Sequence, residues 1–172
     1  MKTLAWGGVV GPVVFVTGWL ALGLTRSHYS MSSDPISELA RVHTSTHAAM
    51  TIVFGVYALC LLGFAHATSN VVAAVNALAT AAVAAFPLGA ADTAHFASAA
   101  VAYVTLALLP LTIRRTAGEW SFTLLIAVLL TASVIAPHNV HGLFQRIGLT
   151  LGDAWIVWRS LQIMKVRSAD YP

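Results

Sequence analysis

The stretch LAWGGVVGPVVFVTGWLALGL, residues 4–24, decides the fold class, because it contains no charged residue. A transmembrane helix needs about 20 consecutive, mostly apolar residues to cross the hydrocarbon core of a bilayer. Five further runs of this kind follow the first: residues 43–67, residues 71–91, a run after Asp92 that reaches residue 113, residues 120–136, and a last run that ends near residue 164. The sequence therefore predicts six membrane-spanning helices.

The composition agrees with that interpretation. Hydrophobic residues make up 58% of the 172 residues and charged residues only 9%, whereas soluble domains carry about 25% charged residues. No P-loop, zinc-finger or dinucleotide motif occurs, and no basic cluster alternates with aromatic residues, so we expect no nucleic-acid partner. We predict one all-α domain over residues 1–172, a polytopic bundle of six transmembrane helices with short loops, whose main partner is the lipid bilayer.

The distribution of basic residues predicts the orientation. Loops on the cytoplasmic side of a membrane carry an excess of Lys and Arg. With the N-terminus inside, six basic residues lie on the inner side and three on the outer side: Lys2, Arg114, Arg115, Arg159, Lys165 and Arg167 against Arg26, Arg41 and Arg146. We therefore expect a multi-pass protein of the cell membrane with both termini in the cytoplasm.

Polar residues gather in the connections after the first, third and fifth spans, which must lie on the same side of the membrane. They are Asp34, Ser37, Glu38, His43, His47, Asp92, His95, His138, Asn139, His141, Gln145 and Arg146. Titratable groups close to a bilayer are costly and are candidates for function. Helix capping and contact with water are the alternative explanation for each residue taken alone.

Asp153 lies inside the last span, where an unpaired acid would cost several kcal/mol. Arg146 is seven residues away, which places the two on roughly the same face of a helix. The sequence leaves two interpretations open, a structural pair with Arg146 and a group that handles a proton.

The segment SDPISELA, residues 33–40, resembles a signature of an uncharacterised prokaryotic membrane family, domain of unknown function 998. Phe86-Pro87, Asp92 with His95, and GLFQR at residues 142–146 support the resemblance in the same order along the chain. The resemblance implies a compact six-helix bundle and no established activity. It matches the acidic and arginine positions of the family to Asp34, Glu38 and Arg146, and leaves His43, His138 and Asp153 without a counterpart.

The first function that we consider is a polar cavity, lined by His and acidic residues at the outer face, that binds a lipid headgroup or small ligand. Asp34, Ser37 and His138 would contact the ligand. Arg146 would contact an anion, and Glu38 would pair with Arg146 when the cavity is empty. We therefore predict that Glu38 and Arg146 meet, directly or through one residue, at the outer mouth of the bundle. A second copy of the chain is a further partner that the sequence leaves open.

Two alternative functions would depend on the histidines. A metal-dependent hydrolase for a lipid-like substrate would bind zinc through His47, Asp92, His95 and His141, which we predict to converge, with Glu38 as general base. The spacing of His43 and His47 is similar to that in membrane hydrolases of the ceramidase and adiponectin-receptor type, although it opens the second span rather than a late one. A haem-binding electron carrier would use His47 with His95 or His141 as axial ligands. Whether the protein is an enzyme stays open.

Overall fold

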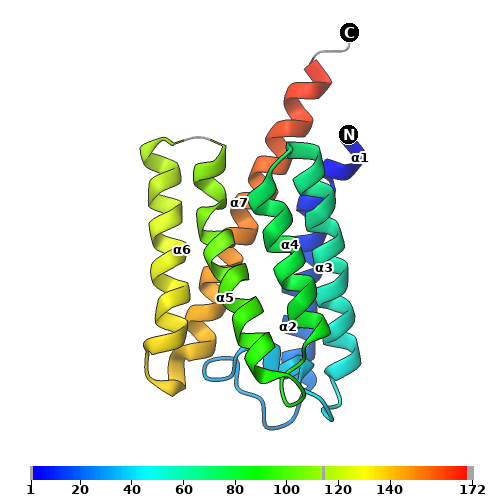
Figure 1. Ribbon diagram of the computed structural model, residues 1–172, viewed down its shortest axis with the longest axis vertical. Coiled ribbons are helices and arrows are strands. Elements are labelled where there is room, and N and C mark those ends of the chain that lie inside the picture. Colours follow the sequence, from blue (N-terminus) through cyan, green and yellow to red (C-terminus); the bar gives the residue numbers. More distant parts are fainter. Residues whose placement is uncertain (1, 114, 170–172) are drawn as a thin grey trace.

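The computed structural model describes residues 2–113 and 115–169, and six long helices follow the six apolar runs (Figure 1). Arg114, which we counted among the inner basic residues, lies outside the described residues. The helices are α2 (Gly7–Thr25), α3 (His47–Thr68), α4 (Val71–Ala85), α5 (Asp92–Leu108), α6 (Ala117–Ile135) and α7 (His141–Ala169). No strand occurs in residues 2–113 or 115–169, which agrees with the predicted all-α class.

Four short elements complete the described chain. The short helix α1 (Lys2–Ala5) precedes α2, and the 3-10 helix η2 (Leu109–Thr112) prolongs α5. The 3-10 helix η3 (His138–Val140) leads into α7. The 3-10 helix η1 (Ile36–Ala40) lies in the long connection between α2 and α3, within the SDPISELA segment.

Four segments are long and apolar enough to cross a membrane, namely Thr3–Thr25, His47–Thr68, Asp92–Thr112 and Ala117–Ile135. The chain is therefore a helical membrane protein. The helix α4 is apolar but shorter, because it ends at Ala85, just before Pro87, and not near residue 91 as expected. A proline lacks the backbone N–H that would continue a helix and disfavours helical backbone in the residue before it. Crossing by α4 and α7 stays a prediction.

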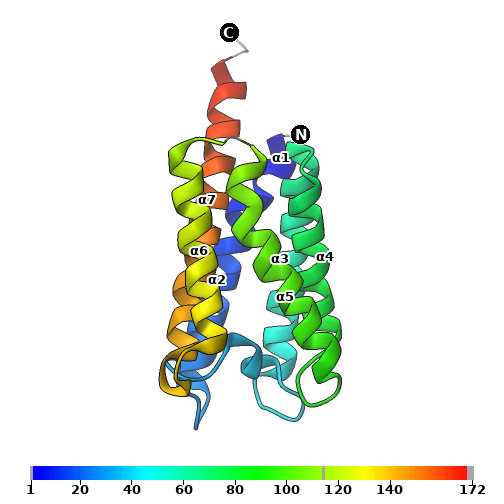
Figure 2. The same cartoon turned by 60° about the vertical axis from the view of Figure 1, so that its left-hand side comes forward.

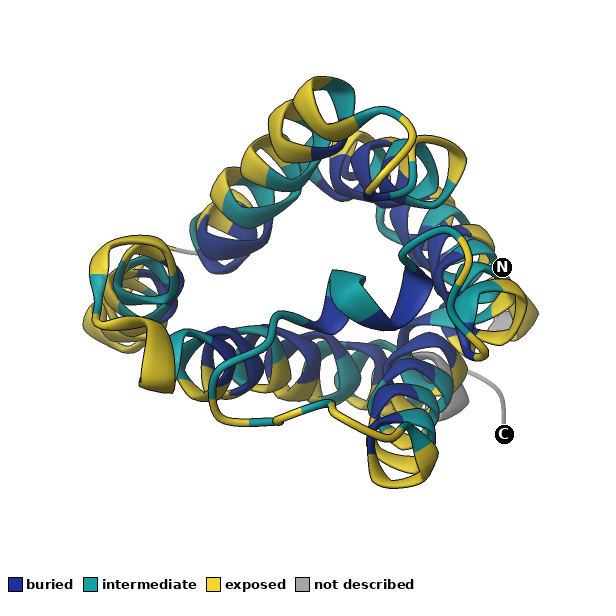
Figure 3. Cartoon of the chain, turned by 90° about the horizontal axis from the view of Figure 1, so that it is seen from below, coloured by how far each residue is buried: buried dark blue, intermediate teal, exposed yellow. Residues whose placement is uncertain are grey.

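The six long helices form a ring. Each packs against the next one in the chain, and α7 closes the ring by packing against α2 (Figures 1 and 2). Both chain ends lie at one end of the bundle, and the connection that contains η1 lies at the opposite end (Figure 1). Seen from that opposite end, η1 lies inside the ring of helices (Figure 3).

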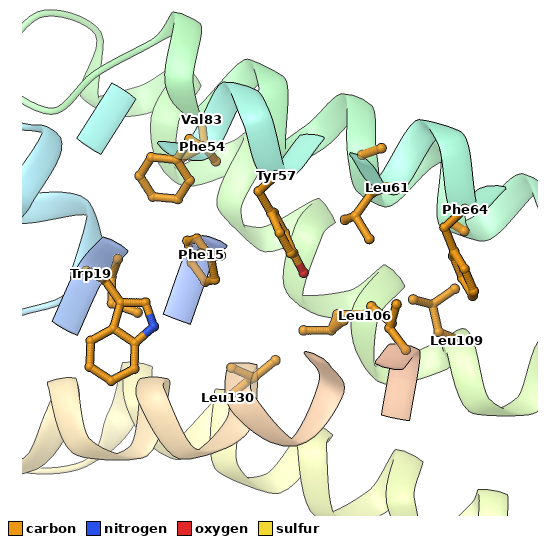
Figure 4. Close-up of a cluster of buried hydrophobic side chains, with 14 of the residues drawn as sticks. Phe15, Trp19, Phe54, Tyr57, Leu61, Phe64, Val83, Leu106, Leu109 and Leu130 are labelled. Atoms are coloured by element: carbon orange, nitrogen blue, oxygen red, sulfur yellow. The ribbon is translucent and has the colours of Figure 1, made fainter. Parts of the chain in front are cut away.

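Large apolar side chains fill the interior and also cover the outside. Phe15, Phe54, Leu61 and Phe64 are buried in the core, where Phe15 stacks on Tyr57 with ring centroids 4.7 Å apart (Figure 4). Many large apolar side chains are nevertheless exposed, such as those of Leu24, Leu59, Ile52, Val71 and Ile135. An apolar interior together with an apolar exterior is expected of a bundle whose solvent is lipid.

Candidate functional site

Arg146 anchors the connection between α2 and α3 onto the start of α7. Its side chain is buried, with 6% of the residue exposed. Its Nη1 donates to the carbonyl oxygens of Met31 at 2.6 Å, Asp34 at 2.9 Å and Gly142 at 2.9 Å. Its Nη2 donates to the hydroxyl of Tyr29, and its guanidinium lies over the rings of Tyr29 and Trp19. The arginine therefore acts as a clamp for the loop.

Tyr29 completes this clamp from the loop side. Burial raises the pKa of Tyr29 to about 12, so the phenol stays protonated at neutral pH. The hydroxyl donates to the carbonyl oxygen of Pro35 at 3.2 Å and accepts from Arg146. One side chain thereby joins the SDPISELA segment to α7.

The expected pair of Glu38 and Arg146 is not what the structure shows. Glu38 accepts from Nη2 and Nε of Arg41 at 2.6 and 2.7 Å, because a separation of three residues brings these side chains together at η1. Arg26 donates to the backbone carbonyl of Glu38. The pairing prediction was wrong because a closer arginine, Arg41, takes the carboxylate, and the two Nη atoms of Arg146 bond to backbone carbonyls and to Tyr29.

Gln145 makes a second link between α7 and η1. Its Oε1 accepts from the backbone N–H of Ile36 at 2.7 Å, and its Nε2 donates to the hydroxyl of Tyr103 on α5. Gly142, one turn earlier, faces the carbonyl oxygens of Met31 and Asp34 so closely that a side chain there would collide with them. In the GLFQR segment, Gly142 thus lets the loop approach α7 closely, and the consecutive residues Gln145 and Arg146 hold the loop by hydrogen bonds.

Of the three residues expected to contact a ligand, only Ser37 borders an interior space. Asp34 accepts from the backbone N–H of Ser30 at 2.8 Å and stabilises its own turn. His138 is exposed, with its ring centroid 5.6 Å from that of His141. These three residues are therefore not gathered around one ligand position.

The four expected metal ligands each bond to the loop next to them. His47 Nδ1 lies 2.7 Å from the carbonyl oxygen of Ala40, and His95 Nδ1 lies 2.8 Å from that of Phe86. His141 Nε2 bonds to the carbonyl oxygen of Ala136. Asp92 Oδ1 accepts from the backbone N–H of Gly89 at 2.6 Å.

No group of three or more His, Cys, Asp or Glu residues that could hold a metal ion occurs in residues 2–113 and 115–169. The predicted convergence of His47, Asp92, His95 and His141 was therefore wrong. The physical reason is their position at or near helix starts, where a preceding loop offers unpaired backbone groups within reach of the side chain.

The interior of the ring instead holds a chamber of about 60 Å³ beneath η1, that is, on the side of η1 that faces the inside of the bundle. Apolar side chains such as Phe15, Phe54 and Leu106 line much of it. Its polar lining comes from separate elements, namely Ser37, Tyr57, Asn76, Thr80, His95, Tyr103 and Gln145. A cavity needs at least about 10–15 Å³ to hold one water, so the chamber has room for a few waters or a solute of similar size.

Sequence reasoning identified Ser37, His95 and Gln145, which line the chamber, but missed Asn76 and Thr80 of α4. Both are polar residues inside an apolar run, four residues apart, and so share one helix face. Asn76 Nδ2 donates to the carbonyl oxygen of Ala102 at 2.7 Å and to Thr105 Oγ1 at 2.9 Å. Polar residues within the predicted spans were the signal that could have identified this chamber.

Asp153 bonds to Tyr57 and not to Arg146. The hydroxyl of Tyr57, a residue that also lines the chamber, donates to Asp153 Oδ1 at 2.5 Å. Asp153 is 2% exposed, and its Oδ2 has no hydrogen-bond partner among the described residues. Arg146 lies two turns earlier, where its Nη1 bonds to loop carbonyls, so the interpretation that pairs Asp153 with Arg146 was wrong and the partner is Tyr57.

These features define a helical membrane bundle in which the loop between α2 and α3 is held over a small, mostly apolar chamber that contains several polar groups. A model of the family described as protein of unknown function (DUF998) matches residues 9–161, and the chain belongs to that family. The match confirms the resemblance inferred from the SDPISELA segment. No curated protein and no solved structure matches the chain.

Proposed function

We propose that the protein binds a small polar solute in the chamber beneath η1, within a bundle of six membrane-spanning helices in the cell membrane. The observation that carries this proposal is the convergence of polar side chains from η1, α3, α4, α5 and α7 on one interior space. Binding sites for small molecules are typically concave and mostly apolar, with a few polar groups that orient the ligand. The lining of the chamber has this character.

The volume of the chamber favours a small solute over a lipid headgroup. About 60 Å³ accommodates a molecule of only a few non-hydrogen atoms, and the clamped loop covers the chamber from outside. Amide, hydroxyl and imidazole groups line it, and no Lys, Arg, Asp or Glu side chain does so among the described residues. An uncharged solute that both donates and accepts hydrogen bonds is the best match for such groups.

The hydrolase and haem interpretations have no comparable support. The zinc hypothesis required His47, Asp92, His95 and His141 to share one ion, but these side chains bond to three different connections between helices. The haem hypothesis required facing histidines from two spans, and among the described residues His95 is the only histidine that lines the chamber.

The experiment uses two neighbouring alanines of α5. Ala99 lines the chamber, whereas Ala100 is exposed on the outside of the bundle. The variant Ala99→Leu fills the chamber and Ala100→Leu is the matched control. The purified proteins are heated with a panel of small amides, alcohols, polyols and short carboxylic acids, because a ligand that binds the folded state raises the melting temperature.

We expect at least one uncharged member of the panel to stabilise the wild type and Ala100→Leu, but not Ala99→Leu. Circular dichroism shows whether both variants keep the helical fold. A panel that stabilises none of the three proteins, or stabilises all three equally, would exclude the chamber as the binding site.

A further inference from the structure

A second and larger cavity lies at the opposite end of the bundle from η1. Its volume is about 880 Å³, and it is bordered by the turn between α3 and α4, the end of η2 and the last turns of α7. Figure 1 shows this end of the bundle, where the chain ends also lie. Helices end here, so the cavity lies at the level where a bilayer presents its headgroups.

Two cations of α7 give this cavity its charge. Arg159 and Lys165 both border it, and Arg159 Nη1 donates to Gln162 Oε1 at 3.0 Å, a contact that orients the guanidinium. None of the described residues that border the cavity is acidic. The positive charges of Arg159 and Lys165 favour the approach of an anion to this border of the cavity.

The turn between α3 and α4 adds hydrogen-bond donors to the same space. Val71 and Val72 border the cavity in the first turn of α4, where backbone N–H groups have no acceptor within the helix. Asn70 holds this helix end in place, because its Oδ1 accepts from the N–H of Ala73 at 3.1 Å and its Nδ2 donates to Thr112 Oγ1 at 2.6 Å. The positive end of the α4 dipole reinforces the charge of the two cations.

We propose that this cavity binds the phosphate group of an anionic phospholipid. Its volume falls in the range of small-molecule sites, roughly 300–1,000 Å³. Ala67, Val71, Ile113 and Ile163 supply an apolar part of the border, against which the first carbons of an acyl chain can pack. A soluble phosphate ester shares the headgroup chemistry, but it lacks the chain that would use this apolar border.

The experiment measures binding by native mass spectrometry of the full-length protein in detergent. One arm adds phosphatidylglycerol, a second adds the zwitterionic phosphatidylcholine, and a third adds glycerol 3-phosphate. The variants are Arg159→Gln and Lys165→Gln. Arg115→Gln is the matched control, because Arg115 is exposed on the same end of the bundle but does not border the cavity.

We expect tighter binding of phosphatidylglycerol than of phosphatidylcholine, with a loss of about fivefold in affinity for each cation removed. The Arg115→Gln control should keep wild-type affinity. Lys165 is exposed near the end of α7, so Lys165→Gln keeps the test valid even where Arg159→Gln fails to fold.

Each other outcome contradicts a stated part of the proposal. Specific binding of glycerol 3-phosphate without binding of phosphatidylglycerol would overturn the lipid as the ligand. Equal binding of the two lipids, or an equal loss in Arg115→Gln, would overturn the cavity as an anion site. If no solute of the panel binds in the chamber beneath η1, the lipid-binding results are unaffected, because the two cavities share no lining residue.

Discussion

Arg146 is a buried cation whose hydrogen-bond partners are backbone carbonyls and a phenol in place of a carboxylate. A guanidinium carries five N–H donors in one plane and can stack on aromatic rings, so it suits a site of this geometry. Because the carbonyls belong to Met31 and Asp34, the residue couples the loop to α7. Its role in this structure is to hold the loop over the chamber.

The first prediction concerns Arg146→Lys. A lysine keeps the charge but has three donors and no planar group, so it loses several of these hydrogen bonds and both ring contacts. We expect the free energy of unfolding to fall by about 2–4 kcal/mol. Arg41→Lys is the control, because Arg41 forms a partly exposed ion pair with Glu38, which is worth less than about 1 kcal/mol. Denaturant unfolding in detergent followed by circular dichroism measures both, and equal losses would refute the clamp.

The second prediction concerns Gln145, which joins η1 to α5. Gln145→Leu leaves the N–H of Ile36 and the hydroxyl of Tyr103 without this partner, so we expect a loss of about 1–3 kcal/mol in unfolding free energy. Tyr103→Phe removes the other end of one of these bonds. If the bond exists, the double variant loses less than the sum of the single losses. Strictly additive losses would show that the two side chains do not interact.

At the scale of single helices, close approach of backbones organises the contact between α2 and α3. A Cβ atom added at Gly7 would collide with the backbone carbonyl oxygen of Cys60, and one at Gly11 would lie 2.8 Å from the Cβ of the same cysteine. Small residues at such positions let membrane helices approach closely and pack. Gly7 and Gly11 are therefore packing positions for α3.

The third prediction compares two glycines. Gly7→Ala should lower the unfolding free energy by about 1–3 kcal/mol, because the backbone of α3 cannot move aside cheaply. Gly55→Ala is the control, since nothing lies within 4 Å of a Cβ added there, and helix propensity favours alanine by about 1 kcal/mol. Thermal unfolding in detergent distinguishes them. A larger loss for Gly55→Ala would contradict the proposed contact between α2 and α3.

The sequence alone was sufficient to predict the helices but not to predict which side chains meet at the candidate site. Each apolar run became one helix, because the lack of charge over about 20 residues is a property of the segment itself. The helix ends moved by a few residues where local groups intervened, as with Pro87 after α4. The prediction that the histidines share one metal ion failed because a polar side chain near a helix start can face its own loop or the bundle axis. Helical spacing does not distinguish these directions.

At the scale of the whole molecule, the decisive contacts join residues far apart in the sequence. Tyr57 meets Asp153 across the ring, and the N–H of Ile36 meets Gln145. Which polar residues share an interior depends on how the helices are ordered and rotated around the ring, and a single sequence does not encode this in any local pattern. The chamber therefore became visible only in the assembled bundle.

The fourth prediction concerns the membrane topology, which depends on all six helices crossing. In a Cys60→Ala background, cysteines replace Ser27 in the loop after α2, Thr116 before α6, and Lys165 near the end of α7. The basic residues counted on the side of the chain ends outnumber those on the loop side by six to three, and this excess marks the cytoplasmic side. In intact cells, an impermeant maleimide should therefore label only the cysteine at position 27.

The three labels separate the ways in which this topology can fail. The helices α3, α4 and α5 lie between positions 27 and 116, so three crossings place these positions on opposite sides of the membrane. If the short helix α4 did not cross, both positions would be labelled alike. The helix α6 and most of α7 lie between positions 116 and 165, so labelling of only one of these two would mean that α6 or α7 does not cross the bilayer. Labelling of positions 116 and 165 without position 27 would agree with crossing by all five helices from α3 to α7 and would reverse the orientation, placing the clamped loop and the chamber beneath it on the cytoplasmic side.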